Sequence, residues 1–198
     1  MNHLAHLVLA GEGDDWRRGA VLGDFWRGAV PASWPAALRA SVRLHRRVDG
    51  WVDARLGAAR ARFDAPWRRY AGIVLDVWFD HLLARDFEQL AGEPLAPFAA
   101  RVAPALAHGE MDWPLAARLY MERLARDAGA ALVAYESLEH VERVYARIAQ
   151  RLARENLVAD ALDAVLPLAP ALARDFAGVW PGLVEFARDE RERLLLAP

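Results

Sequence analysis

The sequence contains no cysteine, lysine or threonine. The absence of cysteine excludes disulfide bonds, thiolate catalysis and cysteine-ligated zinc sites. Because lysine is absent, all 25 basic residues are arginines, and each carries a permanently charged planar group suited to phosphate and carboxylate. The net charge of -2 gives no indication of a nucleic-acid partner.

Long hydrophobic runs are also missing, since none approaches the ~20 residues that a membrane-spanning helix needs. The opening residues MNHLAH carry two histidines where a secretory signal would have basic residues before an apolar core. We therefore expect a cytoplasmic protein with no membrane partner. With 198 residues, 55% of them hydrophobic, the chain is expected to form a single helical domain over residues 1–198.

Strong helix formers (Ala, Leu, Arg and Glu) dominate the chain, and no alternating run bounded by turns predicts a strand. The sequence therefore predicts an all-α, multi-helix bundle. Glycines and prolines indicate where helices end. The predicted helices cover about 2–10, 14–27, 35–56, 57–63, 65–90, 95–107, 113–128, 131–155, 157–165, 168–176 and 181–195.

The third predicted helix has one face that is apolar at both ends and polar in the middle. This face consists of Leu38, Val42, His45, Asp49, Val52 and Leu56. The spacing is that of one side of an α-helix, so His45 and Asp49 point where core residues should point. The structural alternative is that Asp49 pairs with Arg46 or Arg47.

A second stripe of this kind runs from residue 73 to residue 87, and it contains Asp76 and Asp80 one helical turn apart. An uncompensated carboxylate inside an apolar stripe costs on the order of several kcal/mol. A positive group must therefore lie nearby, either an arginine, a protonated histidine or a metal ion. His81 is adjacent in the sequence. A structural ion-pair network is the alternative.

His6 and Asp24 are likewise polar residues inside apolar runs. Their alternatives are a satisfied core histidine and a helix-end carboxylate. The candidate site then comprises His6, Asp24, His45, Asp49, Asp76, Asp80 and His81. Imidazole and carboxylate together suit Mn, Fe, Zn or Mg better than Ca. His108 and His140 have polar neighbours in the sequence and are predicted to lie on the surface.

Four motifs carry a resemblance to a known family. They are MNHLAHLVLA (1–10), LGDFWRG (22–28), LHRRVDGWVD (44–53) and LDVWFDHLLARDF (75–87). In this order and spacing they resemble the acyl carrier protein phosphodiesterases, also called holo-acyl-carrier-protein hydrolases. The resemblance covers about the first 90 residues, whereas the remainder matches only in helical character and length. The matching positions are His6, Asp24, His45, Arg46, Asp49, Asp76, Asp80 and His81.

The resemblance implies an all-α fold distantly similar to HD-type phosphohydrolases, although the His-Asp dipeptide of those enzymes is reversed here as Asp80-His81. It implies cleavage of the phosphodiester between the serine of holo acyl carrier protein and 4'-phosphopantetheine. It also implies a divalent metal ion, Mn²⁺ first with Mg²⁺ or Fe²⁺ as alternatives, and an acidic acyl carrier protein as the substrate.

The chemistry of these residues suggests which of them bind the metal ion and which act in catalysis. The predicted metal ligands are His6, Asp24, Asp80 and His81. Asp49 or Asp76 is expected to orient a ligand histidine or to accept the proton of the attacking water. Arg46 is expected to neutralise the phosphoryl oxygens, and His45 to protonate the leaving serine as a general acid.

Arginines crowd the region between residues 39 and 69, and they are predicted to steer an acidic carrier protein towards the site. This set comprises Arg39, Arg43, Arg47, Arg60, Arg62, Arg68 and Arg69. A solvated helix surface is the alternative. Two other functions stay open: an HD-type phosphohydrolase of nucleotides, and a non-catalytic module that binds carrier protein.

Overall fold

The computed structural model describes residues 2–107, 113–152 and 154–196, and this part of the chain contains helices and no strand. The predicted all-α class is therefore confirmed. The α-helices are α1 (His3–Ala10), α2 (Asp14–Leu22), α3 (Ala36–Asp53), α4 (Gly57–Ala61), α5 (Ala71–Arg85), α6 (Phe87–Ala91), α7 (Leu95–Val102), α8 (Leu115–Arg126), α9 (Ala130–Val133), α10 (Leu138–Arg151), α11 (Ala161–Val165) and α12 (Ala169–Leu196). Short 3-10 turns are η1 (Trp67–Arg69), η2 (Ala103–Leu106), η3 (Ala134–Glu136), η4 (Val158–Asp160) and η5 (Leu166–Leu168).

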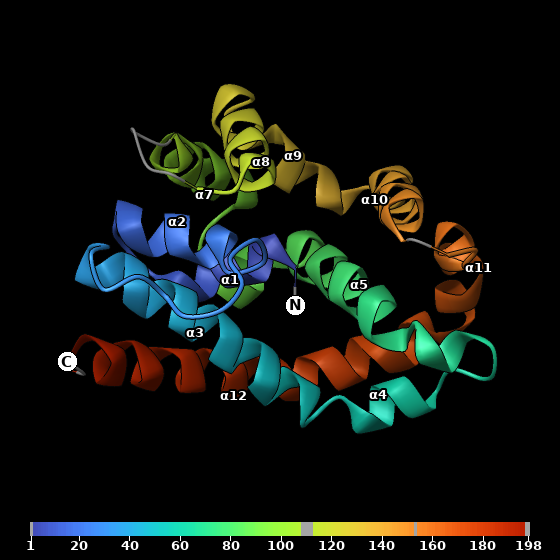
Figure 1. Ribbon diagram of the computed structural model, residues 1–198. Coiled ribbons are helices and arrows are strands. Elements are labelled where there is room, and N and C mark those ends of the chain that lie inside the picture. Colours follow the sequence, from blue (N-terminus) through green and yellow to red (C-terminus); the bar gives the residue numbers. More distant parts are fainter. Residues whose placement is uncertain (1, 108–112, 153, 197–198) are drawn as a thin grey trace.

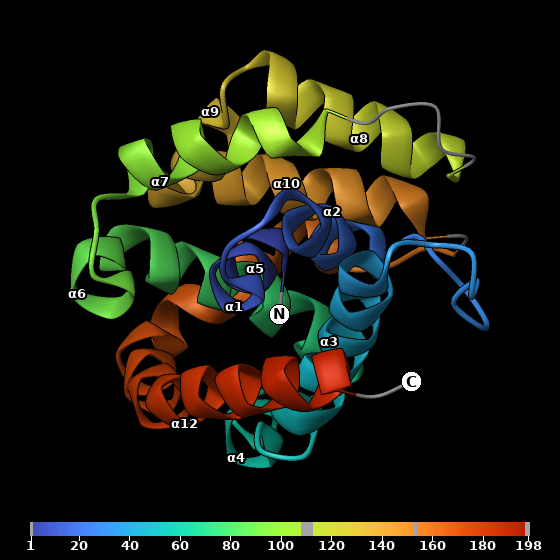
Figure 2. The ribbon, with the colours of Figure 1, turned by 90° about the vertical axis from the view of Figure 1, so that its left-hand side faces the viewer.

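The helices form three layers, which Figures 1 and 2 show from two sides. Helices α1, α2 and α5 lie in the middle. Helices α7 to α10 cover one side of this layer, and α3 and α12 cover the other. Among the described helices, none combines the length and the apolar composition needed to cross a membrane.

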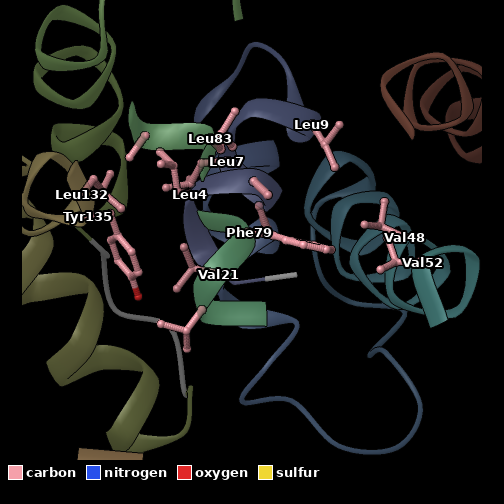
Figure 3. Close-up of a cluster of buried hydrophobic side chains, with 14 of the residues drawn as sticks. Leu4, Leu7, Leu9, Val21, Val48, Val52, Phe79, Leu83, Leu132 and Tyr135 are labelled. Carbon is pink, nitrogen blue, oxygen red and sulfur yellow. The ribbon is translucent and has the colours of Figure 1, made fainter. Parts of the chain in front are cut away.

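The core lies between these layers, as the close-up in Figure 3 shows. Leu4 of α1, Val48 of α3 and Phe79 of α5 are at most 1% exposed. Burial of each such side chain contributes about 1.5–3 kcal/mol. The short first helix is therefore enclosed by apolar side chains, and the polar groups that it carries must find partners inside the protein.

Helices α2 and α3 pack at very short range, and this contact places the polar face of α3. A Cβ atom on Gly19 would lie 2.4 Å from the Cβ of Ser41, so only glycine fits there. Ser41 Oγ donates a hydrogen bond to the carbonyl of Trp16 at 2.5 Å. The turn that follows α2 is thereby brought against the middle of α3, where His45 lies.

Several sequence-based expectations were wrong. The helix predicted over 65–90 is divided into η1, α5 and α6, and the helix predicted over 131–155 is divided into α9, η3 and α10. The predicted break at Pro181 does not occur, because α12 continues through this proline. Proline removes one helical hydrogen bond, but the buried Trp180 and Leu183 on either side of it hold the helix against the core. His140 is not on the surface but 7% exposed, with its ring against Tyr135 at 5.1 Å. His108 lies outside the described residues.

Candidate metal centre

Two stacked histidines form the floor of the candidate site. His6 comes from α1 and His45 from α3, and their ring centroids are 3.7 Å apart with an angle of 14° between the planes. Both side chains are 2% exposed. The enclosed position of α1 and the amphipathic face of α3 thus bring two imidazoles together inside the protein.

Two carboxylates form the rim above these rings. Asp49 lies one turn after His45, with its two oxygens 3.1 Å from His6 Nε2 and 3.3 Å from His45 Nε2. Asp24, in the turn after α2, places Oδ1 3.3 Å from His45 Nε2. The side chains of Asp24 and Asp49 are 41% and 40% exposed. They open onto a pocket of about 300 Å³ that Arg27 and Arg46 also line.

A backbone carbonyl fixes the orientation of His45. Its Nδ1 lies 2.7 Å from the carbonyl oxygen of Ala20. Because a carbonyl can only accept, Nδ1 carries a proton and donates it, and Nε2 is the atom that faces the two carboxylates. Metal-binding histidines commonly have their second nitrogen held in this way.

A glycine makes room for the His45 ring. A Cβ atom on Gly23 would lie 2.2 Å from Cγ of His45 and 2.6 Å from Nδ1. The turn after α2 therefore needs glycine at this position, since any side chain would push the imidazole away from Ala20 and Asp24.

The surroundings of His6 and His45 shift the pKa values of these two imidazoles in opposite directions. Burial lowers the pKa of His45, but the carboxylates of Asp24 and Asp49 outweigh burial and raise it to about 9. Burial and then the neighbouring His45 lower the pKa of His6 to about 4. Burial also acts to raise the pKa values of Asp24 and Asp49, yet the histidines that contact them hold both well below the usual range. In the absence of metal, one imidazolium thus lies between two carboxylates.

This arrangement fits a divalent cation. Ligand atoms of His6, His45 and Asp49 all lie within 4.8 Å of one another. The contacts of 3.1–3.3 Å among them match the roughly 3.0–3.4 Å that separates neighbouring ligands around an ion with bonds of about 2.1 Å. Two neutral imidazoles with the carboxylates of Asp24 and Asp49 carry two negative charges, which a divalent ion balances.

Comparison with known proteins identifies the family. A family model described as "Acyl carrier protein phosphodiesterase" matches residues 1–183. The chain belongs to this family. Relatives that carry the name acyl carrier protein phosphodiesterase include one from Yersinia pestis, 44% identical over 92 residues (46% of this chain and 48% of the relative). Another, from Pectobacterium atrosepticum, is 43% identical over 101 residues (50% of this chain and 52% of the relative).

These matches have a limited extent. The chain spans about half the length of the curated relatives that it matches. No solved structure matches the chain. The expected similarity to HD-type phosphohydrolases therefore stays a prediction.

Within the family motifs, the structure brings together His6, Asp24, His45 and Asp49, but it places Asp80 elsewhere. Asp80 is fully buried, and its carboxylate accepts the backbone N–H groups of Leu4 at 2.9 Å and Ala5 at 3.3 Å. A carboxylate at the first turn of a helix satisfies unpaired amides and is favoured by the helix dipole. Burial raises the pKa of Asp80 to about 7, although the two hydrogen bonds from Leu4 and Ala5 act to lower it.

His81 also lies apart from the four converging residues. Its Nδ1 lies 2.8 Å from the carbonyl oxygen of Tyr135, and its ring packs on Trp78 at a centroid distance of 4.8 Å. These contacts join α5 to η3. The assignment of Asp80 and His81 as ligands stays a prediction, and their contacts in the structure are those of residues that position helices.

Arg46 and Asp76 lie near the site in different ways. Arg46 donates to the carbonyls of Gly28 at 2.8 Å and Trp26 at 2.9 Å, and so holds the loop at the mouth of the pocket. Burial raises the pKa of Asp76, and the nearby carboxylates of Asp49 and Asp53 add to this effect. Asp76 therefore lies within electrostatic reach of the rim.

Two residues of the site were not predicted. His3 Nε2 lies 2.9 Å from Asp24 Oδ2, and its place three residues before His6, on the same helix face, was an available signal. Arg27 lines the pocket, but an arginine next to Gly28 has no pattern that separates it from other surface arginines. Including His3, three histidines and two aspartates meet in this region.

We expect Asp80→Ala to lower the free energy of unfolding, because the amides of Leu4 and Ala5 would be buried without an acceptor at about 1–3 kcal/mol each. Urea denaturation measures this loss. Asp86→Ala is the control, since Asp86 lies just beyond α5 and pairs with Arg85 at the surface. Asp80→Asn keeps an acceptor and should retain metal binding. Loss of metal from Asp80→Asn with unchanged stability would make Asp80 a ligand instead.

Proposed function

We propose that this protein hydrolyses the phosphodiester that links 4'-phosphopantetheine to the serine of holo acyl carrier protein, with a divalent metal ion held by His6, Asp24, His45 and Asp49. The supporting observation is the convergence of two imidazoles and two carboxylates beneath an open pocket. Family membership supports the substrate class. Mn²⁺ is the proposed ion.

The reaction joins one water to one phosphodiester. The water oxygen forms a new bond to phosphorus while the bond from phosphorus to the serine oxygen breaks. One water proton ends on the serine oxygen, and the products are the serine hydroxyl of apo carrier protein and the phosphomonoester 4'-phosphopantetheine. A bound divalent ion supplies charge neutralisation at the phosphate and a water of lowered pKa.

The residues of the chain orient the site and move the proton. Because both ring nitrogens of His45 already face Ala20 and the carboxylates, His45 is better placed to bind the ion than to act as the general acid. His3, whose Nε2 lies 2.9 Å from Asp24 Oδ2, is proposed to pass the proton to the serine oxygen, and Asp24 orients its ring. Arg27 lines the pocket and is proposed to face the phosphoryl oxygens.

The contacts of the predicted steering arginines show which of them are already neutralised by an acidic partner. Arg47 pairs with Glu190, Arg60 with Asp53 and Arg62 with Asp175. Arg39 and Arg68 donate to backbone carbonyls. An ion pair cancels much of the field that would attract an acidic partner. A hydrogen bond to a carbonyl leaves the charge of an arginine in place, so Arg39 and Arg68 stay available for steering. We place the carrier-protein contact itself at the pocket mouth, where Arg27 and Arg46 lie.

A mass assay tests this function. Purified protein is mixed with holo acyl carrier protein and Mn²⁺, with and without a chelator, and the mass of the carrier protein is followed. We expect loss of the phosphopantetheine mass only when metal is available. Unchanged carrier mass from folded, metal-loaded protein would contradict the proposal. Hydrolysis of free nucleotides in the same preparation would then favour the nucleotide phosphohydrolase.

A further inference from the structure

A second pocket, of about 110 Å³, lies where the start of α1 meets α8 and α10, away from the open pocket above the metal centre. Arginines are its main charged residues: Arg123 comes from α8, and Arg147 and Arg151 come from α10. No aspartate or glutamate lines it. The three positive charges therefore surround one hollow.

The partners of these arginines decide what the pocket can bind. Within the described ranges, Arg123, Arg147 and Arg151 form no ion pair, although Arg143 on the same face of the molecule pairs with Glu139. The Arg123 guanidinium instead lies 5.5 Å from the ring centre of Tyr120. Like charges held together without a counter-ion repel each other, and a bound anion would relieve this repulsion.

The pKa of the buried His140 shows that it lies within electrostatic reach of these arginines. It lines the same pocket, and its pKa is lowered to about 4 by burial and then by Arg147, Arg143 and Arg123. At neutral pH this imidazole is uncharged, so it can accept or donate a hydrogen bond without adding to the repulsion.

His3 links this pocket to the metal centre. Its ring centroid lies 4.5 Å from that of Tyr120, which also lines the pocket. Its Nε2 lies 2.9 Å from Asp24 Oδ2 in the metal centre. The two sites thus share one side chain, and an anion in the second pocket would lie next to a residue of the first.

We propose that this pocket binds a phosphate-type dianion, either inorganic phosphate or the phosphate end of a phosphomonoester. Its volume of about 110 Å³ holds such a group with a few waters, each of which takes roughly 30 Å³. It is smaller than the ~300–1,000 Å³ typical of pockets for whole organic ligands. The proposal stands on this pocket alone and does not require the proposed function.

Binding is tested by titration calorimetry on the full chain, stripped of metal and freed of chelator. The probes are inorganic phosphate and 4'-phosphopantetheine, against chloride at matched ionic strength. We expect saturable binding to the unsubstituted protein, and a Kd raised about tenfold or more in Arg147→Gln and Arg151→Gln, because each removes a charge-assisted hydrogen bond. Tighter binding of phosphate would identify the free ion as the ligand. Tighter binding of the phosphomonoester would identify the end of a larger molecule.

Arg143→Gln is the matched control, because Arg143 lies on α10 but does not line the pocket. Its Kd should change much less than that of Arg147→Gln, because Glu139 already compensates the charge of Arg143. Thermal unfolding gives a second measurement, since a ligand that binds the folded state raises the Tm. At one phosphate concentration, the Tm of the unsubstituted protein and of Arg143→Gln should rise more than the Tm of Arg147→Gln. Equal Kd values in all the variants, or no saturable binding of either probe, would overturn the proposal.

Discussion

Replacing Asp49 by alanine is expected to abolish metal binding and to reduce hydrolysis of holo acyl carrier protein to background. Asp49 contacts both imidazoles, at 3.1 Å and 3.3 Å. Its removal takes away one proposed ligand and one of the two negative charges that balance the divalent ion. Loss of an outer-shell partner alone costs roughly 10–100-fold in metal affinity, and loss of a ligand should cost more. Calorimetric titration with Mn²⁺ and the carrier mass assay measure the two effects.

Asp53→Ala is the matched control for this experiment. Asp53 lies one turn further along α3, its side chain is 63% exposed, and it pairs with Arg60 at the surface. A surface ion pair contributes about 0–1 kcal/mol, so this variant should keep its metal affinity and turnover. If Asp49→Ala binds Mn²⁺ as tightly as Asp53→Ala, the metal centre does not lie at His6, His45 and Asp49.

The second large effect is expected from Gly23→Ala. The added Cβ atom would lie 2.2 Å from Cγ of His45, a distance that requires the ring or the turn to move. The movement would separate Nδ1 from Ala20 and Nε2 from Asp24. We expect metal affinity and kcat to fall at least tenfold, and the free energy of unfolding to fall by about 1–3 kcal/mol.

Gly50→Ala makes the same chemical change on α3 where a Cβ atom meets nothing within 4 Å. Alanine in an open helix position is favoured over glycine by about 0.8–1.0 kcal/mol, so this control should be slightly more stable and fully active. Urea denaturation, Mn²⁺ titration and turnover are measured for both variants. Wild-type metal affinity in Gly23→Ala would show that the position of the His45 ring does not control the site.

Part of the site could be predicted from helical periodicity. His45 and Asp49 interrupt an apolar stripe at a spacing that puts them on one face, and the structure places both at the centre of the cluster. His6 and Asp24 could be proposed because each stands alone in an apolar run. Periodicity states which way a side chain points, and that was sufficient for His45 and Asp49.

Periodicity could not predict which group a buried polar side chain contacts. Asp76 and Asp80 have the same spacing as His45 and Asp49, yet Asp80 binds the first amides of α1, a contact between residues 76 positions apart. The course of α12 through Pro181 depends in the same way on distant packing. Intrinsic preferences are weak, and tertiary contacts override them.

The imidazolium of His45 has a consequence for a cell that is short of metal. Below a pH of about 9 the proton on His45 lies between Asp24 and Asp49, where it takes over part of the charge that an ion would neutralise. A proton is always available, so the two carboxylates are not left to repel each other when the ion is lost. Under the proposed function, loss of the ion would stop hydrolysis while the His45 proton compensates the two carboxylates, and added metal would displace this proton.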